Sequence, residues 1–234
     1  MKLLFFSDIH GNQYALDEFL KSDQVKNADE LIFCGDVFGY YYYQNEILDK
    51  FRNMQGLKAV LGNHDKMFLD VIDGKLDVDI LVTRYGNTYK HNIEKISKKN
   101  IEFLRSLPHK LELNIDGCKI GVFHGSPSDP LNGRIYPDTD ISDIKNYLKY
   151  DFVILGHTHH RMVKKVMGTS VINPGSLGQQ RDGKGCSALL LDLGNEKFDF
   201  ITIQYNVNKL IRDVDLFDAG NLKLKEVLLR KEKN

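Results

Sequence analysis

The sequence predicts an α/β protein that forms one domain over its 234 residues. Short apolar runs alternate with helical patterns in the first half of the chain, and this order is typical of a sheet that is parallel there. Hydrophobic residues make up 42% of the chain, which is enough to bury a sizeable core. The second half has short strands separated by turns that contain glycine, which favours antiparallel pairs.

The first half is expected to hold three strand-helix units. Asn12 precedes the first helix and has a side chain that caps helices well. Residues 73–94 are polar and mixed and give no assignment. The strands are predicted at Lys2–Phe6, Glu30–Cys34 and Lys58–Leu61, and the helices at Gln13–Ser22, Gln44–Asn53, from about Asp65, and at Ser97–Leu107 before Pro108.

The second half begins with a predicted hairpin, in which an Asp-Gly turn at residues 116–117 joins two strands. The two helices that close the chain, over roughly residues 206–230, are expected to be appended to a single domain that spans residues 1–234. In order, the predicted elements are strands Leu111–Ile115 and Lys119–Phe123, a helix near Ser142–Leu148, strands Phe152–Leu155, Met162–Met167, Ser170–Ile172, Ser187–Leu193 and Lys197–Tyr205, and helices Asn206–Phe217 and Leu222–Leu229.

Composition and charge exclude several classes of partner. Lysine and arginine number 32, as do aspartate and glutamate, and the isoelectric point is near 7.1, so neither long nucleic acid nor a membrane surface is an expected partner. No apolar run has the length of a membrane span, and nothing at the N-terminus resembles a signal peptide. Cys34, Cys118 and Cys186 are widely spaced, which predicts no disulfide framework and a cytoplasmic location.

Polar side chains recur at the ends of the predicted strands, each time with a glycine beside them. Ligands bind at strand ends in α/β sheets, so we expect these side chains to meet in one place. Asp8 and His10 stand two residues apart in an extended segment and therefore point the same way. The five stretches are Asp8-Ile9-His10-Gly11, Gly35-Asp36, Gly62-Asn63-His64-Asp65, His124-Gly125 and Gly156-His157-Thr158-His159.

These side chains form a mixed set of nitrogen and oxygen ligands. Carboxylate, imidazole and amide oxygen together suit Mn, Fe, Zn, Co or Ni better than Ca or Mg. Seven such ligands are too many for one closed tetrahedral site, but they suit two ions that share a bridging carboxylate. Two ions about 3.5–4 Å apart can hold a hydroxide between them and stabilise both oxygens of an in-line phosphoryl displacement.

The five stretches, in this order over residues 8–159, resemble the motifs of the calcineurin-like metallophosphoesterases. The later segment Asn173-Pro174-Gly175-Ser176 and the residues after it, to Gly183, look like the small bacterial and archaeal branch of that superfamily. The resemblance covers nearly all of the chain except the C-terminal helices. It implies a four-layer α/β/β/α sandwich with two mixed sheets and with the metals at the strand ends.

The resemblance also implies a role for each residue of the motifs. The cofactors would be two divalent transition-metal ions, with Mn favoured. His64 would be a general acid or a phosphate contact, paired with Asp65, because an imidazolium oriented by a carboxylate can protonate a leaving oxygen near neutral pH. Asp8, His10 and His159 would hold one ion, Asn63, His124 and His157 would hold the other, and Asp36 would bridge them.

The expected activity is hydrolysis of a phosphoester in a small phosphorylated substrate, such as a nucleotide. A phosphodiesterase or a nucleotide or dinucleoside polyphosphate hydrolase is favoured over a phosphomonoesterase or protein phosphatase, since no added domain is evident that could bind a protein. A non-catalytic metal-binding scaffold is one alternative, although such proteins usually lose ligands that are all present here. A nuclease is another, and the neutral charge argues against it. Assembly as a homo-oligomer stays open.

Several further residues have two interpretations. Arg181 either binds a phosphate through its planar guanidinium or only orders its own loop. The run Tyr40–Tyr43 departs from the family pattern, and it either stacks on a ring of the substrate or packs on the following helix. His160 should point away from its neighbour His159. His91 and His109 are expected at the surface.

Overall fold

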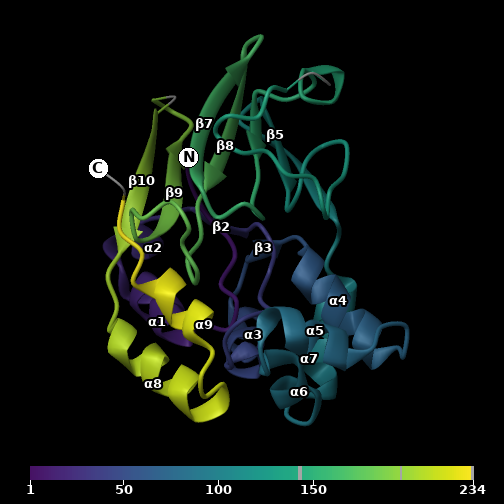
Figure 1. The fold of residues 1–234 in the computed structure, drawn as a ribbon. Coiled ribbons are helices and arrows are strands. Elements are labelled where there is room, and N and C mark those ends of the chain that lie inside the picture. The colour runs from purple at the N-terminus through teal and green to yellow at the C-terminus, as the bar shows by residue number, and fades with distance from the viewer. Residues whose placement is uncertain (142–143, 196, 233–234) are drawn as a thin grey trace.

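The computed structural model describes residues 1–141, 144–195 and 197–232 of the chain. Strands alternate with helices in the first half, as predicted, and strands dominate the second half (Figure 1). The elements are β1 (Lys2–Phe6), α1 (Gln13–Lys21), α2 (Asp23–Lys26), β2 (Glu30–Phe33), α3 (Gln44–Asn53), β3 (Lys58–Ala59), α4 (Asn63–Ile72), α5 (Val78–Tyr85), α6 (Thr88–Ile93), α7 (Lys98–Ser106), β4 (Lys110–Ile115), β5 (Cys118–Phe123), the 3₁₀ turn η1 (Ile144–Asn146), β6 (Phe152–Ile154), β7 (Arg161–Val166), β8 (Thr169–Pro174), β9 (Cys186–Asp192), β10 (Lys197–Ile203), α8 (Val207–Phe217) and α9 (Leu222–Leu228).

The first sheet has the strand order β10-β9-β1-β2-β3. Strands β1, β2 and β3 run parallel, as predicted, whereas β9 is antiparallel to both β1 and β10. Strand β3 is shorter than the predicted Lys58–Leu61, because the Leu61 amide donates instead to the Pro108 carbonyl oxygen at 2.8 Å. The sheet is therefore mixed, with its parallel part formed by the first half of the chain.

The second sheet has the order β4-β5-β6-β8-β7 and is mixed as well. The pairs β4–β5 and β7–β8 are antiparallel hairpins, as predicted. The expectation of antiparallel pairs is wrong for β6, which runs parallel to both β5 and β8. After β5 the chain crosses back to the end of the sheet where β5 begins, and β6 starts there. Such a crossover makes the next strand parallel.

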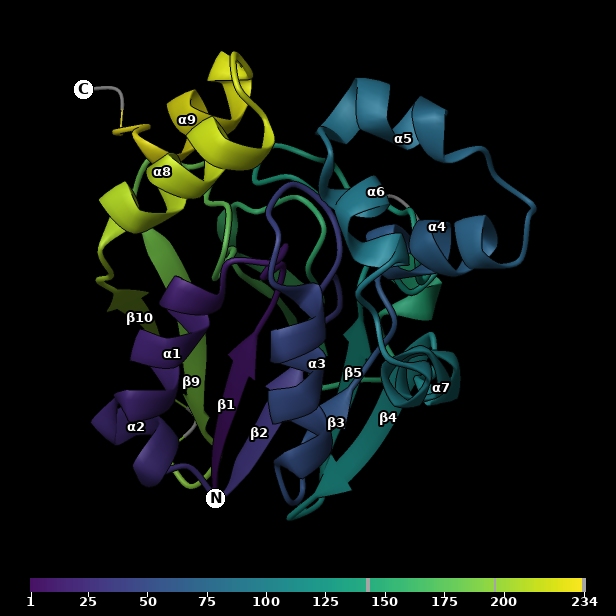
Figure 2. The same ribbon diagram turned by 90° about the horizontal axis from the view of Figure 1, so that it is seen from below.

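The two sheets pack face to face across an apolar core. Leu3 and Phe5 of β1 point into this core and meet Ile120 and Val122 of β5. The alternate residues of β1 point to the other face, where Phe6 and its neighbours pack against α1 and α3. Figure 2 shows these two helices covering the outer face of the first sheet.

The outer face of the second sheet is covered by a thinner layer. Phe123 and Val153 pack there against Tyr147 and Tyr150, which follow η1. Of the helix predicted near Ser142–Leu148, residues 142 and 143 lie outside the described residues, and the turn η1 occupies Ile144–Asn146. The fold is thus the predicted α/β class with two stacked mixed sheets.

The stretch 73–94, which the sequence leaves unassigned, holds helices α5 and α6. Helix α5 begins after Asp77, whose side chain accepts from the Asp79 amide, and it ends at Gly86, which has a φ of +88°. Helix α4 begins at Asn63, two residues before the predicted start. These short helices lie at the same end of the molecule as α8 and α9 (Figure 2).

The C-terminal helices pack on the tyrosine run. Tyr41 and Tyr42 are buried against Leu210, Val214 and Leu224 of α8 and α9. The Tyr41 hydroxyl donates to the Leu224 carbonyl oxygen at 3.1 Å. These two rings therefore pack mainly on α8 and α9. The prediction that they pack on α3, the helix that follows them, is wrong.

None of the described helices is long and apolar enough to cross a membrane. Among the described residues no disulfide is formed, and the thiols of Cys34 and Cys186 are buried. Burial raises the pKa of both thiols, so they behave as small apolar core residues.

Candidate metal centre

The seven predicted ligand residues lie together, and six of them follow the carboxyl ends of four strands. Asp8 and His10 follow β1, and Asp36 follows β2 in the same sheet. The three histidines come from the second sheet, with His124 after β5, and His157 and His159 after β6. Asn63 is the first residue of α4. The parallel strands of both sheets thus bring their ends to one place.

Asp8, His10 and His159 form the first cluster, and all three are buried. Asp8 Oδ1 lies 3.7 Å from His10 Nε2 and 3.2 Å from His159 Nε2, and the two Nε2 atoms are 2.9 Å apart. Nδ1 of His10 lies 2.5 Å from the Phe38 carbonyl oxygen, and Nδ1 of His159 lies 2.6 Å from that of Gln179. A carbonyl oxygen only accepts, so each Nδ1 is the donor.

This pattern fixes which nitrogen of each ring carries a lone pair. Burial lowers the pKa of both His10 and His159, so the rings are neutral, and each Nε2 then presents a lone pair to the other. Two lone pairs and a carboxylate facing one another are the environment of a cation.

Asp36, His124 and His157 form the second cluster, with Asn63 beside it. His124 Nδ1 donates to the Cys34 carbonyl oxygen at 2.9 Å, which turns His124 Nε2 toward Asn63 Oδ1 at 2.9 Å. Burial alone would lower the pKa of His124, but the nearby Asp36 carboxylate raises it to about 9. A ring oriented by a carbonyl oxygen in this way is typical of metal-binding histidines.

Asp36 belongs to the second cluster and also lies close to the first. Its Oδ2 atom is 3.8 Å from His10 Nε2 and 3.2 Å from His124 Nε2. This oxygen is buried without a hydrogen-bond partner among the described residues, while Oδ1 accepts from the His64 amide at 2.8 Å. An unpartnered buried carboxylate oxygen is costly unless a cation binds it. The residues therefore fit two divalent ions that share Asp36.

The backbone at five of these positions is strained. A left-handed conformation costs a residue other than glycine about 1–2 kcal/mol, because Cβ approaches the following carbonyl oxygen. Strain of this kind is typical of functional sites. The φ angles are +55° at Asp8, +49° at His10, +69° at Asp36, +67° at His157 and +60° at His159.

Two glycines allow the loops of the site to approach one another. A Cβ on Gly62 would lie 2.0 Å from Asp36 Oδ1, and one on Gly39 would lie 2.6 Å from His64 Nδ1. Gly39 also has a φ of +95°, which disfavours other residues. Any side chain at either position would displace a functional group of the site.

His64 lines the cavity beside the clusters, but its partner differs from the predicted one. His64 Nδ1 lies 2.7 Å from the hydroxyl of Tyr89, a buried residue of α6. Burial raises the pKa of Tyr89 well above its usual value and lowers that of His64 well below. The pair therefore consists of a protonated phenol and a neutral imidazole.

Asp65 does not pair with His64, and this prediction is wrong. The Asp65 carboxylate accepts four backbone N–H groups and so holds two loops together. Helix α4 places residues 64 and 65 on different sides of its first turn, which explains why neighbours in sequence have separate partners. The four donors are the amides of Asp36 at 3.0 Å, Val37 at 2.9 Å, Phe38 at 2.9 Å and Gly62 at 3.0 Å.

Two arginines line the cavity, which has a volume of about 200 Å³. Arg181, a predicted substrate contact, donates from Nη2 to the Tyr40 hydroxyl at 2.8 Å. Arg134 donates from Nε to His157 Nε2 at 3.0 Å. No sequence pattern marks Arg134, Tyr85 or Tyr89 as residues of the site, because they stand in polar segments without periodicity.

The remaining candidates lie outside the cavity. Asn12 caps α1 by accepting from the Ala15 amide at 3.1 Å, as predicted. His160 packs near the ring of Tyr136 and is absent from both clusters. His109 is exposed. His91 is half-buried at the surface, where its ring packs between Tyr42 and Phe217 and its Nε2 lies 3.0 Å from Lys95 Nζ.

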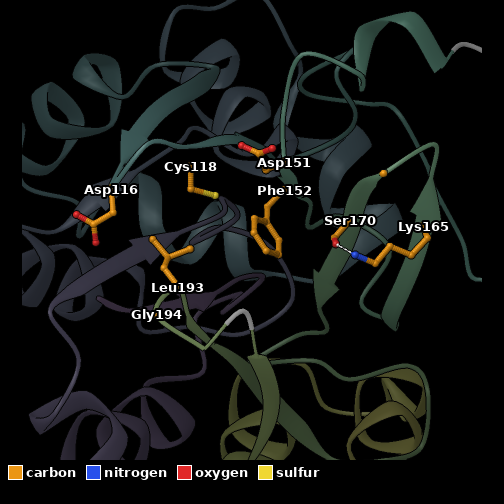
Figure 3. Close-up of a pocket in the computed structure, with 9 residues that line it drawn as sticks. Asp116, Cys118, Asp151, Phe152, Lys165, Ser170, Leu193 and Gly194 are labelled. Carbon is orange, nitrogen blue, oxygen red and sulfur yellow. Dashed lines mark hydrogen bonds between the residues drawn. The ribbon is translucent and has the colours of Figure 1, made fainter.

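A cavity of about 440 Å³ opens at the opposite end of the strands (Figure 3). It is lined by Cys118 and Phe152, which begin β5 and β6, and by the hairpin residues Lys165 and Ser170. Lys165 Nζ donates to Ser170 Oγ at 2.6 Å. None of the predicted site residues lines it, so the clustered ligands define the candidate site.

Comparison with known proteins finds similarity to phosphoesterases. Residues 1–196 match the model of the calcineurin-like phosphoesterase superfamily domain. The uncharacterized protein MJ0912 of Methanocaldococcus jannaschii is 31% identical over 221 residues, which is 87% of each chain. The phosphodiesterase MJ0936 of the same organism is 25% identical over 176 residues, 75% of this chain and 83% of that one. A metallophosphoesterase structure from Sphaerobacter thermophilus has a TM-score of 0.78 and 25% identity, covering 98% of both chains.

Proposed function

The chain belongs to the calcineurin-like phosphoesterase superfamily, and from this we propose that it is a two-metal phosphodiesterase that hydrolyses small nucleotide substrates. It is a metal-dependent phosphoesterase by family, and a relative is named a phosphodiesterase. The observation that carries the proposal is the position of Asp36, which belongs to the second cluster of buried ligands and lies close to the first. A side chain that can bind a metal stands at each of the seven ligand positions, which argues against a non-catalytic scaffold.

The proposed ligand sets follow the two clusters. When bound, the two ions supply an activated water as nucleophile and neutralise the charge on the phosphate. The nitrogen and oxygen donors suit Mn, Fe, Zn, Co or Ni, and Mn is our first choice. Asp8, His10 and His159 would hold one ion, Asn63, His124 and His157 would hold the other, and Asp36 would contact both.

His64 is positioned to donate a proton to the leaving oxygen. We assign the protonated Tyr89 hydroxyl as the hydrogen-bond donor to His64 Nδ1, which places the hydrogen of the neutral ring on Nε2. During hydrolysis the water oxygen bonds to phosphorus, the ester P–O bond breaks, and the leaving oxygen takes this proton. The proton that the attacking water releases restores the one lost by the ring. The donor is thus a neutral imidazole held by a phenol, in place of the expected imidazolium held by a carboxylate.

The two arginines of the cavity hold the phosphate. Arg181 is fixed by Tyr40 and by Gln179 Oε1, which accepts from it at 3.2 Å, so its guanidinium is already oriented. Arg134 uses Nε on His157, and its two terminal nitrogens have no partner among the described residues. Planar guanidinium groups bind phosphate oxygens in pairs, which suits both positions.

The test is a substrate panel with Mn²⁺ that spans phosphomonoesters, cyclic nucleotides, dinucleoside polyphosphates and aryl diesters. We expect hydrolysis of diesters or polyphosphates to exceed that of monoesters. Asp36→Asn and His124→Ala should lose activity, while His109→Ala, an exposed histidine, serves as the matched control. The proposal is overturned if Asp36→Asn and His124→Ala proteins remain as active as wild type.

A further inference from the structure

A cleft of about 680 Å³ lies beside the metal cavity. Its walls come from the end of α5 with Arg84 and Tyr85, from the loop with Arg181, and from residues 220–230 around α9. Figure 2 shows α5 and α9 at the same end of the molecule. Apart from the Arg181 loop, these walls come from segments that the family motifs do not include, namely the unassigned stretch and the C-terminal helices.

The cleft and the metal cavity adjoin each other. Tyr40, Tyr85 and Arg181 line both of them, and the rings of Tyr40 and Tyr85 meet edge to face with centroids 5.6 Å apart. Tyr40 also packs against His10 and His64 of the site, at 4.7 and 5.2 Å between centroids. A group bound at the metals and a second group bound in the cleft would therefore both contact these side chains.

The charge of the cleft is one-sided. Arg84, Arg181, Lys223 and Arg230 line it, and no carboxylate does. None of these four cations forms an ion pair within the part of the chain that the structure describes. By contrast Lys225, which lies on α9 with Lys223, pairs with Asp215. The whole chain has no net charge, so this concentration is local. Unpaired cations in a concave surface attract anions strongly.

We propose that this cleft binds a phosphate chain of the substrate, remote from the phosphorus that reacts. This inference rests on the proposed phosphodiesterase function and narrows its substrate to molecules that carry several linked phosphates, such as dinucleoside polyphosphates. The metal cavity, at about 200 Å³, accommodates a phosphate and little more, while the cleft has the volume of a ligand pocket. Arg181 stands where the two anionic groups meet.

The test compares the double variant Arg84→Gln/Lys223→Gln with Lys98→Gln/Lys99→Gln. The first pair is exposed in the cleft, and the second pair is exposed on α7, away from it. With Mn²⁺, we expect the cleft variant to lose about tenfold more kcat/KM on diadenosine tetraphosphate than on bis(p-nitrophenyl) phosphate. The α7 variant should treat both substrates as wild type does.

A binding measurement separates this inference from the proposed function. Inorganic tripolyphosphate is titrated calorimetrically into EDTA-treated protein, where we expect the cleft variant to bind about tenfold more weakly than wild type. Equal binding of tripolyphosphate by wild type and the cleft variant, or an equal loss of kcat/KM on the two substrates, overturns the inference. The proposed phosphodiesterase function is unaffected by either result. Weaker binding by the variant, with wild type hydrolysing neither substrate, supports the cleft and overturns the proposed function.

Discussion

His10 and His159 place their Nε2 atoms 2.9 Å apart, while Nδ1 of each ring is directed to a backbone carbonyl oxygen. The two side chains come from different sheets and stand 149 residues apart in the sequence. Neutral rings held in this way repel each other through their lone pairs, and the Asp8 carboxylate adds to the repulsion. A cation between them converts this repulsion into coordination.

Metal binding should therefore stabilise the protein strongly. Saturating Mn²⁺ should raise Tm by about 10 °C over EDTA-treated protein, since a ligand at a thousandfold of its Kd adds about 4 kcal/mol. Differential scanning calorimetry measures the shift, and His109→Ala should show the same shift. An identical Tm with and without metal would show that the clusters do not bind it.

Tyr89→Phe tests the orientation of His64. The variant removes only the hydroxyl that bonds to His64 Nδ1, and we expect kcat to fall about tenfold with little change in KM. Steady-state kinetics on a diester substrate with Mn²⁺ measures both constants. Tyr150→Phe, which removes a hydroxyl bonded to Glu112 outside the site, is the control. If both variants keep full kcat, Tyr89 does not orient the proton donor.

Asp65→Asn tests the loop connection at the first turn of α4. The amide NH₂ would face backbone donors that now bond to the carboxylate, so we expect a loss of about 3 kcal/mol in unfolding free energy. Urea unfolding measures this loss. Asp70→Asn, which breaks a more exposed pair with Lys66 on the same helix, should cost less than about 1 kcal/mol. If both variants lost the same unfolding free energy, the buried hydrogen bonds of Asp65 would stabilise the protein no more than the exposed pair does.

The strand-end ligands were predictable because glycine-flanked Asp and His residues recur after apolar strands, and parallel strands end at one edge. The partner of His64 was not, because Tyr89 lies in a stretch without periodicity and reaches the site only through tertiary packing. Arg134 was missed for the same reason. The left-handed φ at Asp36 has no sequence signal, since only the surrounding packing enforces it.

His124 should make the stability of the metal-free protein depend on pH. Its folded pKa of about 9 lies above the ordinary 6.5, so the pair with Asp36 stabilises fully below pH 6.5 and is lost as the pH rises through 9. We expect the unfolding free energy with EDTA to fall by roughly 1–3 kcal/mol over this range. The other site histidines His10, His64, His157 and His159, whose pKa values are lowered, are already neutral there.

Urea titrations at several pH values give this curve for wild type and for His124→Asn. The variant should show a flatter dependence between pH 6.5 and 9, because it lacks the titrating group. A wild-type curve that rises over the same window, or parallel curves for the two proteins, would contradict the assignment of the proton to His124.

The metal content of the purified protein tests the two-ion centre most directly. Protein loaded with Mn²⁺ and freed of excess ion is analysed by inductively coupled plasma mass spectrometry, together with Asp36→Asn and His109→Ala. Wild type and His109→Ala should retain about two ions per chain, and Asp36→Asn should retain clearly fewer because it lacks the shared carboxylate. Fewer than about one ion per wild-type chain would contradict a two-metal centre at these residues.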